Sequence, residues 1–261
     1  MTDSGLTTRL VRRVRTQVGG FFSNTLRGTA GVCPACTGPA TSGLCPQCRS
    51  AHTNHRGHLA DLVVPLAYAQ GRRNPRHQSE HHMYMYKRSP PAPRCVQDLK
   101  LMMAAATAVH GPCIARVTGW WDVLTFVPSR SHPGPSHPVV NLARQVVTPP
   151  DKTPTRVLLE PGPGYDEPPY RAPRRDRFRL SDTFEGAVSG RHVLVVDDTW
   201  VSGDKGQSAA LTLKAAGAST VTVLCVARWL RADWPDHEDL ITRLEQPYDP
   251  LCCPVSGGTC E

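Results

Sequence analysis

The stretch HVLVVDDTWVSG, residues 192–203, decides the fold. Its apolar run ends at two adjacent carboxylates, Asp197 and Asp198, and apolar residues resume at helical spacing over residues 206–216. This pattern predicts a strand, a turn and a helix. Parallel sheets bind their ligands where strands end and helices begin, so the turn is a candidate binding site.

The segments around this stretch repeat the same alternation. Strands are expected at residues 59–70, 121–127, 157–159 and 221–226, and helices at 95–110 and 139–146. Such alternation predicts an α/β fold with an open, mostly parallel sheet flanked by helices. The polar residues 71–94 are expected to be an excursion over the surface, and residues 160–176 are Pro-rich and charged.

The composition favours a basic protein of the cytoplasm. The net charge of +8 suits a ligand that carries phosphate, or nucleic acid. No apolar run approaches the roughly 18 residues of a membrane span, and no apolar core follows the N-terminal arginines as in a secretory signal. Residues 1–31 are expected to form a basic segment, either an amphipathic helix packed on the body or an arm that binds an acidic partner.

Residues 33–48, CPACTGPATSGLCPQC, contain two CxxC pairs. Each pair can direct two thiolates at one ion, and the Gly-rich linker returns the chain for the second pair. Cys33, Cys36, Cys45 and Cys48 therefore predict a zinc site. Four thiolates leave no open coordination position, which indicates a structural role. The alternative, two disulfides, suits a cytoplasmic protein poorly.

Further Cys and His residues lie far apart in the sequence. His110 and Cys113 occur in HGPC, and Cys253 and Cys260 lie in the ending CCPVSGGTC. One His and three thiolates could form a second zinc site that fixes the tail to the body. The alternative is that these are buried free thiols. Residues 77–82, HQSEHH, are expected to be a solvated surface run rather than a metal site.

The turn after residue 198 has the chemistry of a sugar-phosphate site. Hydroxyls and backbone N–H groups at a helix N-terminus suit a phosphate monoester, and two carboxylates can accept hydrogen bonds from vicinal hydroxyls. Together they describe a ribose 5-phosphate. The carboxylates could instead bind a metal, act as general acid and base, or cap the turn.

The segment VLVVDDTWVSGDKGQSAA resembles the motif that binds phosphoribosyl pyrophosphate (PRPP) in type I phosphoribosyltransferases. A four-Cys module ahead of such a domain resembles the ComF-like members of that family. The resemblance implies a zinc-ribbon-like module over residues 32–58 and a phosphoribosyltransferase-like domain over 59–228. Outside them the sequence predicts the basic segment over residues 1–31 and a Cys-rich tail over 229–261 that packs on the body.

The resemblance also implies roles for single residues. Asp197 and Asp198 would bind the ribose hydroxyls, and Arg130 would contact the pyrophosphate, so these three are the expected catalytic residues. Lys87, in MYMYKRS, resembles a lysine of the same group, with a substrate-site or a structural role. The full PRPP-binding set would be Ser129, Arg130, Asp197, Asp198, Thr199, Trp200, Val201, Ser202, Gly203, Asp204 and Lys205.

The activity that the resemblance implies is transfer of the 5-phosphoribosyl group from PRPP to a nitrogenous acceptor, with Mg²⁺ on the departing pyrophosphate. Residues 131–140, SHPGPSHPVV, lack the Arg-Gly-Phe-Asn-Gln segment usual in the ComF-like group, and Val201 and Lys205 replace hydroxyl residues. A protein that binds PRPP without turnover therefore stays open. So does a regulatory protein that binds nucleic acid through its zinc module and N-terminal arginines.

Overall fold

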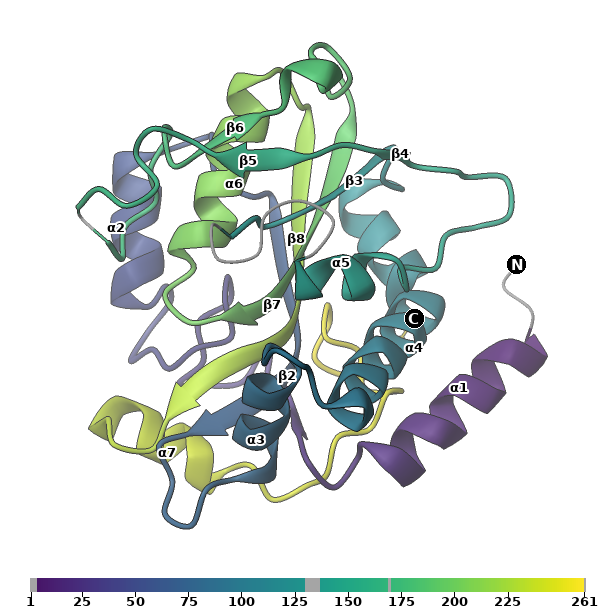
Figure 1. Cartoon of the computed structure of the whole chain (residues 1–261). Coiled ribbons are helices and arrows are strands. Elements are labelled where there is room, and N and C mark those ends of the chain that lie inside the picture. Colours follow the sequence, from purple (N-terminus) through teal and green to yellow (C-terminus); the bar gives the residue numbers. More distant parts are fainter. Residues whose placement is uncertain (1–3, 130–136, 169, 261) are drawn as a thin grey trace.

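A six-stranded sheet forms the centre of the protein in the computed structural model, which describes residues 4–129, 137–168 and 170–260 (Figure 1). Its order is β1 (Ser23–Asn24), β2 (Leu62–Gly71), β8 (Thr220–Arg231), β7 (His192–Trp200), β3 (Val123–Phe126) and β4 (Thr155–Arg156). The last five strands are parallel and β1 is antiparallel to β2. The predicted open, mostly parallel α/β fold is confirmed.

Helices cover both faces of the sheet. One core joins the sheet to α1 (Ser4–Gln17), α3 (Gln78–Met85), α4 (Pro93–Thr118) and α5 (Pro138–Ala143). The core on the other face includes α6 (Asp204–Ala215), the four Cys of residues 33–48, and the small sheet of β5 (Leu159–Pro161) and β6 (Phe178–Leu180). The remaining helices are α2 (Pro46–Asn54), the short η2 (Asp182–Phe184) and α7 (Pro235–Thr242).

Strand β7 shows how the sequence assigns side chains to these two faces. Val193 and Val195 belong to the α6 core, whereas Leu194 and Val196 belong to the α4 core. Successive side chains of a strand alternate between faces. Strand β7 extends past residue 196 to Trp200, and the alternation continues through Asp198, whose carboxylate contacts Tyr86 of the α4 core. Trp200 belongs to the α6 core, so the alternation ends before that residue. The two adjacent carboxylates therefore leave β7 on opposite faces of the sheet.

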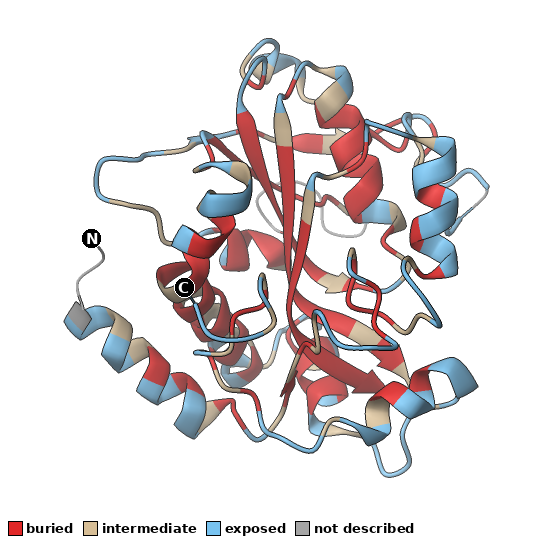
Figure 2. Cartoon of the chain, turned by 180° about the vertical axis from the view of Figure 1, so that it is seen from behind, coloured by how far each residue is buried: buried red, intermediate tan, exposed pale blue. Residues whose placement is uncertain are grey.

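The expected surface run at residues 77–82 is wrong. Residues 78–82 lie in α3, where Glu80 and His82 are buried. Figure 2 colours the whole chain by burial, with the strands of the central sheet mostly buried. The His82 ring packs against Phe21 with centroids 4.5 Å apart, and its Nε2 lies 3.2 Å from Asp98 Oδ2. Three of the four buried side chains of this helix are polar, Ser79, Glu80 and His82 beside Met83, so no apolar periodicity marks it in the sequence.

Helix α1 corresponds to the amphipathic alternative for the N-terminal segment. Val14 and Val18 are fully buried in the core that α1 shares with α4. Arg15 Nη2 lies 2.8 Å from Asp249 Oδ2 in the C-terminal tail. The N-terminal helix and the tail therefore support each other on the body.

None of the helices in the described ranges combines the length and the apolarity that crossing a bilayer requires.

Replacing the buried Asp98 should destabilise the protein. Asp98→Ala removes the partner of His82 and of Arg94, whose Nε lies 3.1 Å from the carboxylate. Loss of one member of a buried ion pair costs about 3 kcal/mol. Urea unfolding should show that loss, while Asp151→Ala at an exposed turn should leave the midpoint unchanged. Equal midpoints for the two variants would contradict this account.

Candidate functional site

A cleft lies where the connections of the parallel sheet diverge. The chain leaves β3 toward β4 on one side, and leaves β7 toward β8 on the other. Such a switch point opens a crevice outside the carboxyl ends of the strands. Here the crevice is a cleft of about 580 Å³, lined by residues at the ends of β2, β3, β7 and β8. That volume lies within the usual range for a small-molecule site.

Asp198 is held at the wall of the cleft on the α4 face. The Tyr86 hydroxyl donates a hydrogen bond to Asp198 Oδ2, and Lys87 Nζ donates to Oδ1 at 2.8 Å. Burial raises the pKa of Asp198, but the charge and hydrogen bonds of Lys87 and the Tyr86 bond outweigh it, and the pKa is lowered. Asp198 is therefore a charged, firmly positioned carboxylate.

Asp197 leaves the same strand on the α6 face. Its Oδ1 accepts the backbone N–H of Asp198 at 2.8 Å. Burial and the neighbouring Asp198 charge raise the pKa of Asp197 to about 7, although Lys87 and Lys205 oppose that rise. Asp197 thus faces the cleft as a carboxylate whose charge a cation or a set of hydroxyl donors would stabilise.

The loop between β7 and α6 is shaped by packing on Trp200. Gly203 has φ +82° and caps α6, and a Cβ at this position would collide with the Trp200 indole. A Cβ at Gly206 would lie 2.7 Å from the same ring. Glycine at both positions lets the loop lie flat on Trp200. The Trp200 side chain is itself buried, so this residue can offer a ligand mainly its backbone.

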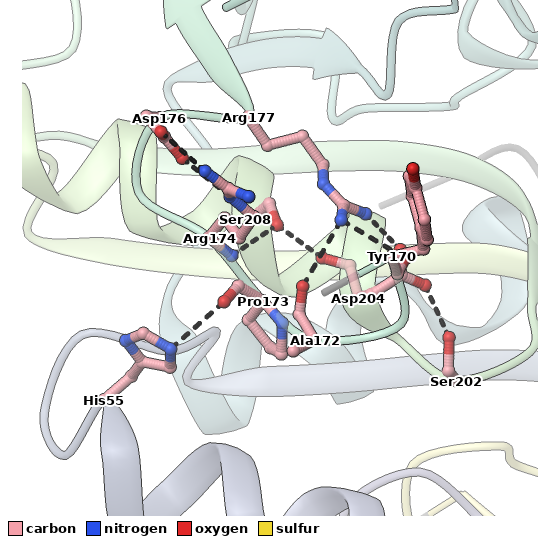
Figure 3. A network of polar contacts seen from close by, with 10 residues as sticks. All are labelled: His55, Tyr170, Ala172, Pro173, Arg174, Asp176, Arg177, Ser202, Asp204 and Ser208. Carbon is pink, nitrogen blue, oxygen red and sulfur yellow. Dashed lines mark hydrogen bonds and ion pairs between the residues drawn. The ribbon is translucent and has the colours of Figure 1, made fainter. Parts of the chain in front are cut away.

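Asp204 and Ser202 are engaged beside the start of α6 (Figure 3). The Asp204 carboxylate accepts hydrogen bonds from Ser202 Oγ and from the buried Arg177 guanidinium. Arg177 Nη2 also donates to the Tyr170 carbonyl at 3.3 Å. The Arg177 guanidinium therefore balances the negative charge of Asp204. The first N–H groups of α6 have no hydrogen-bond partner within the helix.

Basic side chains outnumber acidic ones in the cleft. The cations are Arg72, Lys87, Arg171, Lys205 and Arg231, against Asp197, Asp198 and Asp204. Lys87 pairs with Asp198 and Arg231 with Asp233. Within the part of the chain that the structure describes, Arg72, Arg171 and Lys205 form no ion pair. Arg72 also adopts φ +63°, a conformation that non-glycine residues seldom hold outside functional sites.

Most of the predicted PRPP-binding residues lie at this cleft. Ser202 is one exception, since it lines a neighbouring pocket under residues 171–173. Arg130 lies outside the described residues. The predicted residues that line the cleft are Ser129, Asp197, Asp198, Thr199, Trp200, Val201, Gly203, Asp204 and Lys205.

Sequence reasoning missed several groups of the site. Tyr86 adjoins the predicted Lys87, but nothing in MYMYKRS shows that its hydroxyl reaches Asp198. Arg72, Arg171 and Arg231 come from three separate segments that only the sheet topology brings together. No local pattern in the sequence distinguishes these arginines from the others.

The four predicted zinc ligands form one cluster. The Sγ atoms of Cys33, Cys36, Cys45 and Cys48 lie within 4.8 Å of one another, and all four residues are buried. Cys36 Sγ and Cys45 Sγ are 3.7 Å apart, close to the roughly 3.8 Å edge of a tetrahedron with Zn–S bonds of about 2.3 Å. The donor set therefore fits a zinc ion.

One buried side chain connects this cluster to the loop of the cleft. Arg228 Nη1 donates to the carbonyls of Trp200 at 3.0 Å and Val201 at 2.7 Å. Its guanidinium also packs against Gly38, where a Cβ would not fit. Residues 33–48, the Cys module, thus support the loop through Arg228.

Comparisons with known proteins give structural likenesses only. No protein-family model matches the chain, and no curated protein matches it. A hypoxanthine-guanine phosphoribosyltransferase of Bacillus anthracis is 13% identical, with a TM-score of 0.32, over 54% of this chain and 70% of that one. An orotate phosphoribosyltransferase of Mycobacterium tuberculosis H37Rv is 17% identical, with a TM-score of 0.29, over 51% of this chain and 66% of that one.

A hypoxanthine phosphoribosyltransferase of Staphylococcus aureus is 8% identical, with a TM-score of 0.35, over 64% of this chain and 89% of that one. All three TM-scores lie below 0.5, and no site residue is assigned from them.

The raised pKa of Asp197 predicts that Asp197→Asn increases the free energy of unfolding of the ligand-free protein, by an amount that depends on pH. Between pH 4 and pH 7 the folded state keeps a proton that unfolded Asp releases, so wild-type stability falls as pH rises. At pH 8 the variant should be more stable by about 2–4 kcal/mol, and the gain should vanish toward pH 4. Thermal unfolding across this range, with Asp239→Asn as the surface control, checks it. Parallel pH profiles for wild type and Asp197→Asn would refute it.

Proposed function

We propose that the cleft binds PRPP with Mg²⁺ and transfers its 5-phosphoribosyl group to a nitrogenous acceptor. One observation carries the proposal. Asp197 and Asp198 meet the N-terminus of α6 in a single cleft, among three cations that form no ion pair in the described part of the chain. A sugar bearing phosphate at two positions has the complementary chemistry, with hydroxyls for Asp197 and anions for the cations.

The 5-phosphate would occupy the loop and the start of α6. Helix N-termini attract phosphate through their exposed N–H groups and dipole. Lys205, in the first turn of α6, adds a positive charge that lines the cleft. Gly203 and Gly206 let the loop and the start of α6 pack closely on Trp200, because a Cβ at either position would meet the indole.

The ribose hydroxyls would face Asp197. Its carboxylate is buried, and hydroxyl donors or a cation would stabilise its charged form. Asp198 has a positioning role in this proposal, because Tyr86 and Lys87 already occupy its oxygens. Lys87, whose side chain is 44% exposed, reaches the ligand space from that anchored position.

The pyrophosphate would lie on the other side of the sugar, near the end of β3, where Ser129 lines the cleft. Arg72, after β2, and Arg171, which also lines the pocket beside Ser202, add positive charge elsewhere in the cleft. Guanidinium groups suit phosphate oxygens. Arg130, directly after Ser129 in the sequence, is proposed as a further contact. Mg²⁺, which prefers oxygen ligands, would neutralise charge on the leaving pyrophosphate.

The transfer itself is a displacement at C1 of the ribose. The acceptor nitrogen forms a bond to C1 as the bond from C1 to the pyrophosphate oxygen breaks, and pyrophosphate carries away the electron pair. Fixed charges at the cleft would stabilise the cationic character that develops on the sugar.

PRPP with Mg²⁺ should raise the melting temperature of the wild type. At 100 times the dissociation constant, a ligand that binds only the folded state adds about 2.7 kcal/mol, or roughly 5–10 °C for a protein of this size. Asp197→Asn and Lys205→Met should each reduce that shift, whereas Asp239→Asn on the exposed face of α7 should retain it. A wild type that melts at the same temperature with and without millimolar PRPP would overturn the proposal.

We also propose that the Cys33–Cys36–Cys45–Cys48 cluster holds a structural zinc ion. Replacing Cys33 and Cys36 with Ser should remove one zinc per chain, measured by elemental analysis of purified protein. It should also weaken PRPP binding, because the module supports residues 200 and 201 through Arg228. Cys95→Ser in α4, which lies outside the cluster, is the matched control. An unchanged zinc content in the double variant would exclude this site.

A further inference from the structure

The C-terminal tail brings a second set of metal-ligand side chains together against α4. The ligand atoms of His110, Cys113, Cys253 and Cys260 all lie within 4.8 Å of one another. We propose that these four residues bind a second zinc ion, which fastens the tail to the body. This proposal does not depend on what the cleft binds.

Helix α4 supplies two of the ligands from one turn. His110 and Cys113 are three positions apart, so both point toward the same side of the helix. His110 is 1% exposed and Cys113 is 8% exposed. Cys253 is also 1% exposed, whereas Cys260, the fourth member of the set, is exposed to solvent.

The His110 ring is set up to offer a lone pair. Its Nε2 lies 2.8 Å from the Pro250 carbonyl oxygen, which can only accept, so the proton is on Nε2. In the neutral ring the lone pair is then on Nδ1, which lies 3.0 Å from Cys260 Sγ. Metal-bound histidines commonly donate their second ring N–H to a backbone carbonyl in this way, which fixes the tautomer and the ring orientation.

The backbone around Cys253 repeats the backbone around Cys33 in the first cluster. The N–H of Cys33 donates to the Gly38 carbonyl at 2.8 Å, and its own carbonyl accepts from Thr37 at 2.9 Å. The N–H of Cys253 likewise donates to the Gly258 carbonyl at 2.7 Å, and its carbonyl accepts from Gly257 at 2.8 Å.

The resemblance of the two turns extends to their conformation and sequence. The residue four places after the Cys has positive φ in both, at +57° for Thr37 and +83° for Gly257. Proline follows the Cys in both turns. Ser256 stands where the first turn has Cys36, so the second site has to draw its other thiolates from elsewhere, and Cys113 and Cys260 supply them.

Arg27 joins the two turns directly. Its Nε donates to the Pro254 carbonyl at 2.7 Å, and its Nη1 donates to the Pro34 carbonyl at 2.5 Å. These are equivalent carbonyls, each following the Cys that begins its turn. One cation thus braces two turns whose bound thiolates would each carry excess negative charge.

The donor set identifies the class of metal. Three thiolates and one imidazole suit Zn²⁺ in tetrahedral coordination. Four protein ligands leave no position for a substrate, so the ion has a structural role. Its binding energy would hold residues 249–260, and with them Asp249, the partner of Arg15 in α1.

Elemental analysis of full-length protein, purified under reducing conditions, tests the site. We expect two zinc ions per chain in the wild type and one in a Cys113→Ser, Cys260→Ser double variant. Cys252→Ser is the matched control, because Cys252 adjoins Cys253 but lies outside the cluster, and it should keep both ions. The Cys33→Ser, Cys36→Ser variant should keep one ion, which separates the two sites.

A second measurement tests the site even if the Cys113→Ser, Cys260→Ser variant fails to fold. Co²⁺ bound to the Cys33→Ser, Cys36→Ser protein should give a thiolate charge-transfer band and the visible absorption of tetrahedral cobalt. Adding His110→Ala to that protein should abolish or shift both. One zinc per wild-type chain would overturn the proposal. So would a disulfide among Cys113, Cys253 and Cys260 in the intact mass, or unchanged cobalt spectra.

Discussion

Two neighbouring carboxylates buried at one strand end repel each other and lose hydration, and the cleft depends on how that repulsion is balanced. Alternation along β7 sends Asp197 and Asp198 to opposite faces. Tyr86 and Lys87 then stabilise the charge of Asp198 from the α4 side. Asp197 is left with a raised pKa and a strong demand for a cation or hydroxyl donors. A ligand that supplies a cation or hydroxyl donors would therefore stabilise the charge of Asp197, and strongly shifted pKa values of this kind are common at binding sites.

Two arginines connect that strand end to other parts of the chain. Arg228 links the loop carbonyls of residues 200 and 201 to the Cys module, and Arg27 links that module to the C-terminal turn. Both satisfy backbone carbonyls in loops that have little regular structure of their own. The two clusters of Cys and His side chains and the cleft thus belong to one connected framework.

Features encoded in contiguous residues were predictable from the sequence. The run ending at Asp197 predicts the central strand, and the two CxxC pairs predict the first cluster, because spacing alone defines them. Helix α3 was not predictable, since its buried face is largely polar and His82 in that face pairs with Asp98 of α4. The arginines of the cleft could not be predicted either, because the strand order brings together segments that are distant in the sequence.

The most direct test of the sugar-phosphate site is a crystal structure of the protein with PRPP and Mg²⁺. The account predicts the 5-phosphate at the backbone N–H groups that begin α6, and the ribose hydroxyls at Asp197. Density for the ligand elsewhere, or a cleft without ligand at saturating PRPP, would contradict it.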